Sequence, residues 1–131
     1  MQRVAAARQL GQLEAVIMER LWSWERPVAV REVLDDLRRD RPIAYTTVMT
    51  VMNNLHRKGL LTREMHGRAY RYQPARSREE HHAELMGQVL AGSGDRAATL
   101  MLLVEQMPPD EVARLRAALA EGAPQDRRRR V

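Results

Sequence analysis

A set of polar side chains recurs every three or four residues along positions 46–57. Thr46, Thr50, Asn53 and Arg57 have this spacing, which places them on one face of a helix. Thr and Asn are weak helix formers, so a helix seldom collects them without a reason. Their hydroxyl and amide groups, together with the guanidinium, can hydrogen-bond to base edges and phosphates. The chemistry that this face suits is the recognition of a nucleic acid.

Residue types that would support an enzyme are scarce. The chain has no cysteine, which excludes disulfides, thiolate metal sites and thiol redox chemistry. His81, His82 and Glu84 have the residue types of metal ligands, but adjacent side chains on a helix point about 100° apart. We interpret this cluster as a solvated face. No glycine-rich phosphate loop, nucleophile motif or acid–base pair is recognisable, so we expect no catalytic residue, no metal and no cofactor.

The charge is divided unevenly along the 131 residues. Residues 1–75 hold 13 basic and 8 acidic side chains, whereas residues 76–126 hold 5 basic and 9 acidic ones. A basic first half indicates a polyanionic partner for that half. The chain has neither a run of about 18 apolar residues nor a secretory signal. We therefore expect a cytoplasmic protein without membrane insertion.

Apolar periodicity predicts three helices in the first half, the third over residues 45–58. Their apolar stripes are Leu10, Leu13, Ile17, Leu21 and Trp24; Val30, Val33, Leu34 and Leu37; and Val48, Val51, Met52 and Leu55. The segment that follows, LLTREMHGRAYRYQP, has β-favouring residues on both sides of Gly67 and predicts a hairpin that ends at Pro74. Three helices and a hairpin are typical of a winged helix-turn-helix, whose third helix enters the major groove of DNA.

The second half of the sequence predicts helices whose apolar surface requires a partner. Ser77 and Glu80 fit a capping box, and Pro108-Pro109 begin a last helix. The segment AATLMLLVEQM between them is apolar around most of its circumference, which favours burial against a second copy of the chain. The residues expected in that dimer interface are Leu100, Met101, Leu103, Val104, Leu115 and Leu119.

The predicted fold class is therefore mainly α with a small β-hairpin. We expect a winged-helix DNA-binding domain over residues 1–75, a helical dimerisation domain over residues 76–122, and a disordered basic tail over residues 123–131 that contains RRRR.

Four stretches resemble the BlaI/MecI/CopY family of penicillinase and methicillin-resistance repressors: AYTTVMTVMNNLHRKGLL, GRAYRYQPA, LEAVIMERLWS and DEVARLRAAL. The resemblance covers residues 10–120. It implies a homodimer that represses transcription on a double-stranded operator with a TACA/TGTA-type inverted repeat, in control of a β-lactamase or a cell-envelope stress response. By position, the implied DNA-binding residues are Thr46, Thr47, Met49, Thr50, Asn53, Asn54 and Arg57, with Arg68 at the wing tip as a further one.

The chain departs from this family in how it would be released from DNA. The resemblance implies a membrane sensor-protease pathway that cuts an Asn-Phe bond near Leu102-Leu103, but the chain has no Phe. The copper-responsive branch uses C-terminal cysteines, which are also absent. Two alternatives stay open: a MarR-like regulator released by a small ligand, and a winged helix that binds proteins only. The short second half leaves little room for a ligand pocket, and the polar third helix disfavours a purely protein-binding surface.

Overall fold

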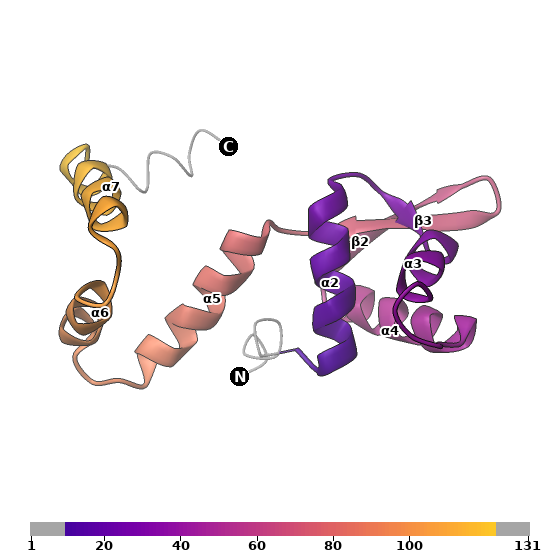
Figure 1. Ribbon diagram of the computed structural model, residues 1–131, viewed down its shortest axis with the longest axis horizontal. Helices are drawn as coiled ribbons and strands as arrows, with labels where there is room; N and C mark the ends of the chain where they lie inside the picture. Colours follow the sequence, from indigo (N-terminus) through magenta and orange to yellow (C-terminus); the bar gives the residue numbers. More distant parts are fainter. Residues whose placement is uncertain (1–9, 123–131) are drawn as a thin grey trace. The chain divides into compact units, whose positions relative to one another are not determined.

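The computed structural model describes residues 10–122 of the chain. It is mainly α-helical with one small antiparallel sheet, as predicted (Figure 1). The expected basic tail over residues 123–131 lies outside the described residues. The elements are α2 (Gln12–Trp24), β1 (Val28–Ala29), α3 (Val30–Leu37), α4 (Tyr45–Arg57), β2 (Leu61–His66), β3 (Ala69–Pro74), α5 (Arg78–Ala91), α6 (Arg96–Val104) and α7 (Pro109–Ala120).

The sheet consists of the predicted hairpin and one strand that the sequence did not reveal. Its order is β1-β3-β2, with both pairs antiparallel. β1 has only two residues, too few to show an alternating pattern, and it pairs Val28 with Tyr72. The turn between β2 and β3 contains Gly67, whose φ of 65° is a left-handed conformation that glycine adopts without strain.

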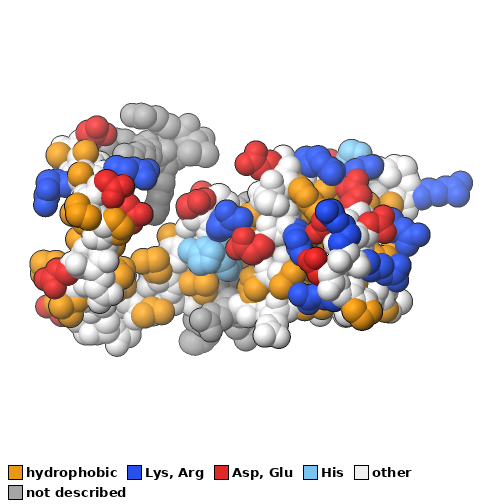
Figure 2. All heavy atoms as spheres, viewed as in Figure 1, with side chains coloured by type: hydrophobic (Ala, Val, Ile, Leu, Met, Phe, Trp, Pro, Cys, Tyr) orange, Lys and Arg blue, Asp and Glu red, His pale blue; other side chains and the backbone are white. Residues whose placement is uncertain are grey.

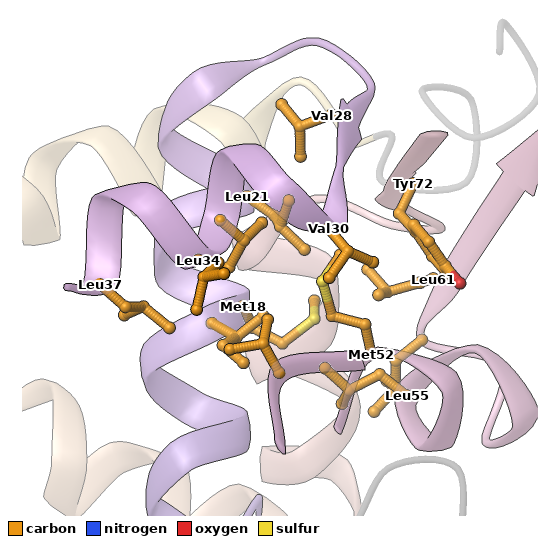
Figure 3. Packing of buried hydrophobic residues seen from close by; sticks show 14 residues of the cluster. Met18, Leu21, Val28, Val30, Leu34, Leu37, Met52, Leu55, Leu61 and Tyr72 are labelled. Carbon is orange, nitrogen blue, oxygen red and sulfur yellow. The ribbon is translucent and has the colours of Figure 1, made fainter. Parts of the chain in front are cut away.

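The core of the first half lies where the three helices meet the sheet (Figure 3). The predicted stripes supply most of it, since Ile17, Leu21, Leu34 and Leu55 are completely buried. Tyr72 enters the same cluster from β3, with its hydroxyl oxygen pointing away from the apolar side chains. α4 is therefore packed along one whole side, which gives its other side a defined orientation.

Two helix ends have recognisable caps. After α4, Gly59 has a φ of 84°, and the Leu60 amide donates to the Leu55 carbonyl over 2.9 Å, as expected for a left-handed helix cap. Before α5, the Ser77 amide donates to Glu80 Oε1 over 2.9 Å, and the Glu80 amide donates to Ser77 Oγ over 3.0 Å. This reciprocal pair is the predicted capping box.

The contacts divide the chain into two units, residues 1–89 and residues 90–131. This division lies inside α5, and the predicted domain boundary at residue 76 stays a prediction. Within residues 10–122, none of the helices has both the length and the apolar character needed to cross a membrane.

Candidate nucleic-acid interface

The outward side of α4 carries the hydrogen-bonding groups that the sequence singled out. Val48, Met52 and Leu55 are completely buried and hold the helix on the core. Opposite them, the side chains at the start of the helix are exposed: Thr46, Thr47, Met49 and Thr50. Within residues 10–122 the hydroxyls of these three threonines form no hydrogen bond to protein. The face therefore presents donors and acceptors that are free to bind a ligand.

No side-chain hydrogen bond caps the start of α4, so these threonines are not used as caps of their own helix. The N-cap residue is Ala44, whose side chain cannot accept a hydrogen bond, and its carbonyl receives the amides of Thr47 and Val48. The loop before it is held by Arg38, whose Nε donates to the Ile43 carbonyl over 3.0 Å. Sequence patterns did not reveal this role of Arg38, because it depends on the path of the loop.

Two predicted interface residues are less exposed than expected. Asn53 is half-buried, and its Oδ1 accepts from Tyr72 Oη over 3.0 Å and from Arg63 Nη1 over 3.1 Å. Asn53 therefore lies partly against the hairpin and does not face fully outward, and its contact with DNA stays a prediction. Asn54 is also half-buried, and its Oδ1 accepts from Arg57 Nη2. Arg57 itself is exposed.

The hairpin adds a cationic tip and exposed apolar side chains. Arg68 follows Gly67 in the turn and is exposed, and so are Met65 and Tyr70, which pair across the two strands. Figure 2 shows Lys and Arg side chains gathered over the unit that contains α3, α4 and the hairpin. The structure thus brings α4 and the hairpin together in one unit, with the predicted residues distributed over both.

Several acidic side chains of this unit are paired with basic ones. No acidic residue occurs between residues 42 and 63. Asp36 and Asp40 pair with Arg20 at 3.1 and 2.9 Å, and Glu14 pairs with Lys58 at 2.7 Å. The exposed face of α4 is therefore free of carboxylates of its own, as a surface that approaches phosphates requires.

A family model described as "Penicillinase repressor" matches residues 10–121. The chain belongs to the penicillinase repressor family. Two curated relatives, both named Transcriptional regulator BlaI, come from Mycobacterium tuberculosis strains CDC 1551/Oshkosh and ATCC 25618/H37Rv. Each is 44% identical over 121 residues, which is 90% of this chain and 88% of the relative. The resemblance to the BlaI/MecI/CopY family is confirmed, and the chain is a transcriptional repressor, not an enzyme.

A solved structure supports the fold of the first unit. The solution structure of the DNA binding domain of the repressor BlaI has a TM-score of 0.51 and 23% identity, and the match covers 56% of this chain and 89% of that domain. At this identity the likeness concerns the fold alone. The winged helix predicted for this penicillinase repressor family member is therefore confirmed.

One further cluster of this family member differs from its prediction. His81, expected on a solvated face, is only 4% exposed, and its ring centre lies 5.5 Å from that of Trp22 on α2. Trp22 Nε1 also donates to the Arg76 carbonyl over 2.9 Å, and Arg78 pairs with Glu19 at 2.7 Å. These contacts attach the first turn of α5 to α2. The periodicity did not reveal them because histidine fits a polar face and a packed one equally well.

The same cluster makes no metal site. Within residues 10–122 no three His, Cys, Asp or Glu side chains are grouped so that they could hold an ion.

Burial of His81 predicts a pH-dependent stability. Desolvation lowers the pKa of His81 from its ordinary value of 6.5; His82 and Arg76 lower it too, whereas Glu84 acts in the opposite direction. The unfolded chain then binds the proton more readily, so the free energy of unfolding falls as the pH drops below about 6.5. Urea unfolding at about pH 7.5 and pH 5.5 should show a smaller change for His81→Gln than for the unmodified protein. His82→Gln is the matched control, and an equal reduction in both variants would contradict the assignment.

Proposed function

We propose that this protein is a homodimeric, cytoplasmic repressor that binds a double-stranded operator with a TACA/TGTA-type inverted repeat. The observation that carries the proposal is the exposed polar side of α4, whose threonine hydroxyls have no partner among residues 10–122 while its other side is packed in the core. A rigid helix with unsatisfied short hydrogen-bonding side chains suits the major groove, where base edges provide matching groups.

The roles of the individual residues follow from their chemistry. Thr46, Thr47, Met49 and Thr50 lie nearest the start of α4 and would contact base edges, because recognition helices read bases mainly with their N-terminal residues. Methyl groups of Thr and Met suit the thymine methyl. The cations Arg57 and Arg68 would bind phosphates. The amide group of Asn54 would hydrogen-bond to DNA. Asn53, which is half-buried beside the hairpin, would also take part in DNA binding.

The apolar surface of the second unit supports a homodimer. Within residues 90–122 no side chain is buried, and Met101 and Leu119 are 61% and 67% exposed. So much exposed apolar surface on two helices calls for a partner. A second copy related by a two-fold axis would cover it and would match the symmetry of an inverted repeat. The proposed interface residues are Leu100, Met101, Leu103, Val104, Leu115 and Leu119.

We propose that the repressor controls the gene of a β-lactamase or the genes of a cell-envelope stress response. The description of the matching family model, penicillinase repressor, supports the β-lactamase assignment. Release through a membrane sensor-protease pathway would require a bond other than Asn-Phe, because the chain contains no Phe.

Fluorescence anisotropy on a labelled duplex tests the proposal. The duplex carries a TACA/TGTA inverted repeat, and a scrambled duplex at the same salt concentration is the control. We expect two chains per operator and an affinity ratio above about 10³. Equal, weak binding to both duplexes would overturn the operator assignment, and selection from a random DNA library would then identify whether any sequence is preferred.

Thr47→Ala should reduce the discrimination between the operator and the scrambled duplex. Thr47 is exposed and its hydroxyl has no partner in the described part of the chain, so its loss removes a base contact without disturbing the core. The expected loss is about 1–3 kcal/mol per half-site, the typical contribution of one base contact. Anisotropy titrations of both duplexes measure it, with circular dichroism to verify folding.

The comparison variant for Thr47→Ala is Arg57→Ala, which removes a proposed phosphate contact from the same helix. Binding to both duplexes should weaken to a similar extent, and the dependence of log K on log [salt] should flatten by about one unit per contact. If Thr47→Ala behaved like Arg57→Ala, Thr47 would not read a base.

A further inference from the structure

Arg63 is a cation held between the hairpin and α4. In the sheet register it pairs with Tyr72 and lies two positions, on the same face, from the pair formed by Met65 and Tyr70. Its Cζ is 4.0 Å from the centre of the Tyr70 ring and 5.9 Å from that of Tyr72. Its Nη1 donates to Asn53 Oδ1 over 3.1 Å and to Tyr72 Oη over 3.3 Å. The guanidinium, carried by β2, is therefore held by β3 and by α4.

No negative charge balances Arg63 within residues 10–122. Several arginines of this unit pair with carboxylates, for example Arg20 with Asp36 and Arg78 with Glu19. Around Arg63 the partners are neutral: an amide, a phenol and an aromatic ring. A half-buried cation loses part of its hydration, and ring and amide partners compensate for this only in part. The described part of the chain thus surrounds this cation with neutral groups only.

Some N–H groups of the Arg63 guanidinium have no hydrogen-bond partner within residues 10–122. Of its five N–H groups, none on Nε or Nη2 takes part in a hydrogen bond with residues 10–122. These two nitrogens form one edge of the planar fork, the geometry that binds two oxygens of one phosphate. Because Asn53 and both tyrosines already restrict the side chain, little conformational freedom would be lost when a phosphate binds.

We propose that Arg63 binds a phosphate of the DNA backbone, and that Asn53, Tyr70 and Tyr72 are positioning residues that hold its guanidinium ready. The inference rests on the proposed operator binding. It adds a contact at the junction of the recognition helix and the wing, where one phosphate would fix both elements on the DNA together. It also explains why Asn53 turns toward the hairpin: its amide oxygen orients the cation.

The test compares Arg63→Gln with Arg71→Gln in the full-length protein. Arg71 lies on the opposite face of the same hairpin, next in register, and has a carboxylate beside it, that of Glu32 at 3.8 Å. Operator affinity is measured by anisotropy over a series of KCl concentrations. Arg63→Gln should weaken binding by about ten-fold per half-site, as for one charge-assisted hydrogen bond. Its salt slope should fall by about 0.9 per contact, or about two per dimer, while Arg71→Gln keeps the slope.

A second variant separates positioning from charge. Tyr70→Leu keeps the cation but removes the ring that covers it, so we expect weaker binding with an unchanged salt slope. An unchanged slope in Arg63→Gln, or an equal fall in Arg71→Gln, would overturn the proposal.

An NMR measurement on the unmodified protein decides the matter even if a variant fails to fold. The assigned Nε–H signal of Arg63 should shift when operator is added in stoichiometric amounts. A signal that stays in place while the protein binds specifically would show that Arg63 only links the wing to α4. Absence of specific binding by the unmodified protein would instead contradict the proposed function itself, so the two failures are distinguishable.

Discussion

Replacing Leu103 and Leu115 by aspartate together is expected to convert the protein into monomers. Both side chains are exposed in a single chain, so the substitutions do not disturb a core of their own. In the proposed dimer the carboxylates would be buried against a second copy, which is strongly unfavourable for unpaired charges. A monomer loses the effective concentration that links its two half-sites, so operator binding should weaken by about 10²- to 10⁴-fold. Multi-angle light scattering and anisotropy measure the two effects.

Arg116→Asp is the control for the double variant. It adds a carboxylate to an exposed position of the same helix, next to Leu115 but outside the proposed interface. We expect it to remain a dimer with near-normal operator binding. An unchanged dimer in the double variant would refute the interface assignment, and a monomeric Arg116→Asp would mean that added charge alone dissociates the protein.

Met52→Ala should have the second large effect, on the stability of the first unit. Met52 is completely buried on the inner side of α4, beside Leu55 and the side chains of α2 and α3. Its truncation leaves a cavity in the core, for which buried Met-to-Ala changes typically cost about 2–5 kcal/mol. Urea unfolding measures the loss. Since the same side chain holds α4, the proposed recognition helix, in place, operator binding should also fall at temperatures where the variant begins to unfold.

The chain offers a control with the same chemistry for Met52→Ala. Met65 lies on β2 and is 55% exposed, so Met65→Ala removes the same atoms without making a cavity. Surface changes of this kind usually alter stability by no more than about 0.5 kcal/mol. Equal losses in the two variants would mean that α4 is not fixed by core packing.

Most of the fold could be predicted because its signals are local. Stripes of apolar residues marked α2, α3 and α4, and the capping box of Ser77 and Glu80 marked the start of α5. Such features depend on neighbours three or four residues away. β1 has no local signal at all, since its two residues become a strand only when Val28 pairs with Tyr72. Its existence depends on a partner more than forty residues further along the chain.

The residues of the candidate site likewise fall into those that local periodicity predicts and those whose placement depends on distant parts of the chain. The exposed threonines of α4 follow directly from helical periodicity, because Val48 and Met52 define the opposite side. Asn53 lies at the border between the two sides, so its direction depends on the nearby hairpin. Arg63 resembles an ordinary solvated residue of a strand, and its role becomes visible only from the pairing that places Tyr70 and Tyr72 around it. The burial of His81 likewise depends on Trp22, which lies on another helix.

The attachment of α5 to α2 has a practical optical consequence. The chain contains two tryptophans, Trp22 and Trp24, and both lie on α2 in the first unit. Trp22 donates its indole N–H to the Arg76 carbonyl and lies against His81. Intrinsic tryptophan emission therefore reports only on the winged helix and on the contact between α2 and the start of α5. Far-ultraviolet circular dichroism, in contrast, reports on the helices of both units. Recorded together during unfolding, the two signals separate the melting of the DNA-reading half from that of the half proposed to dimerise, without any label.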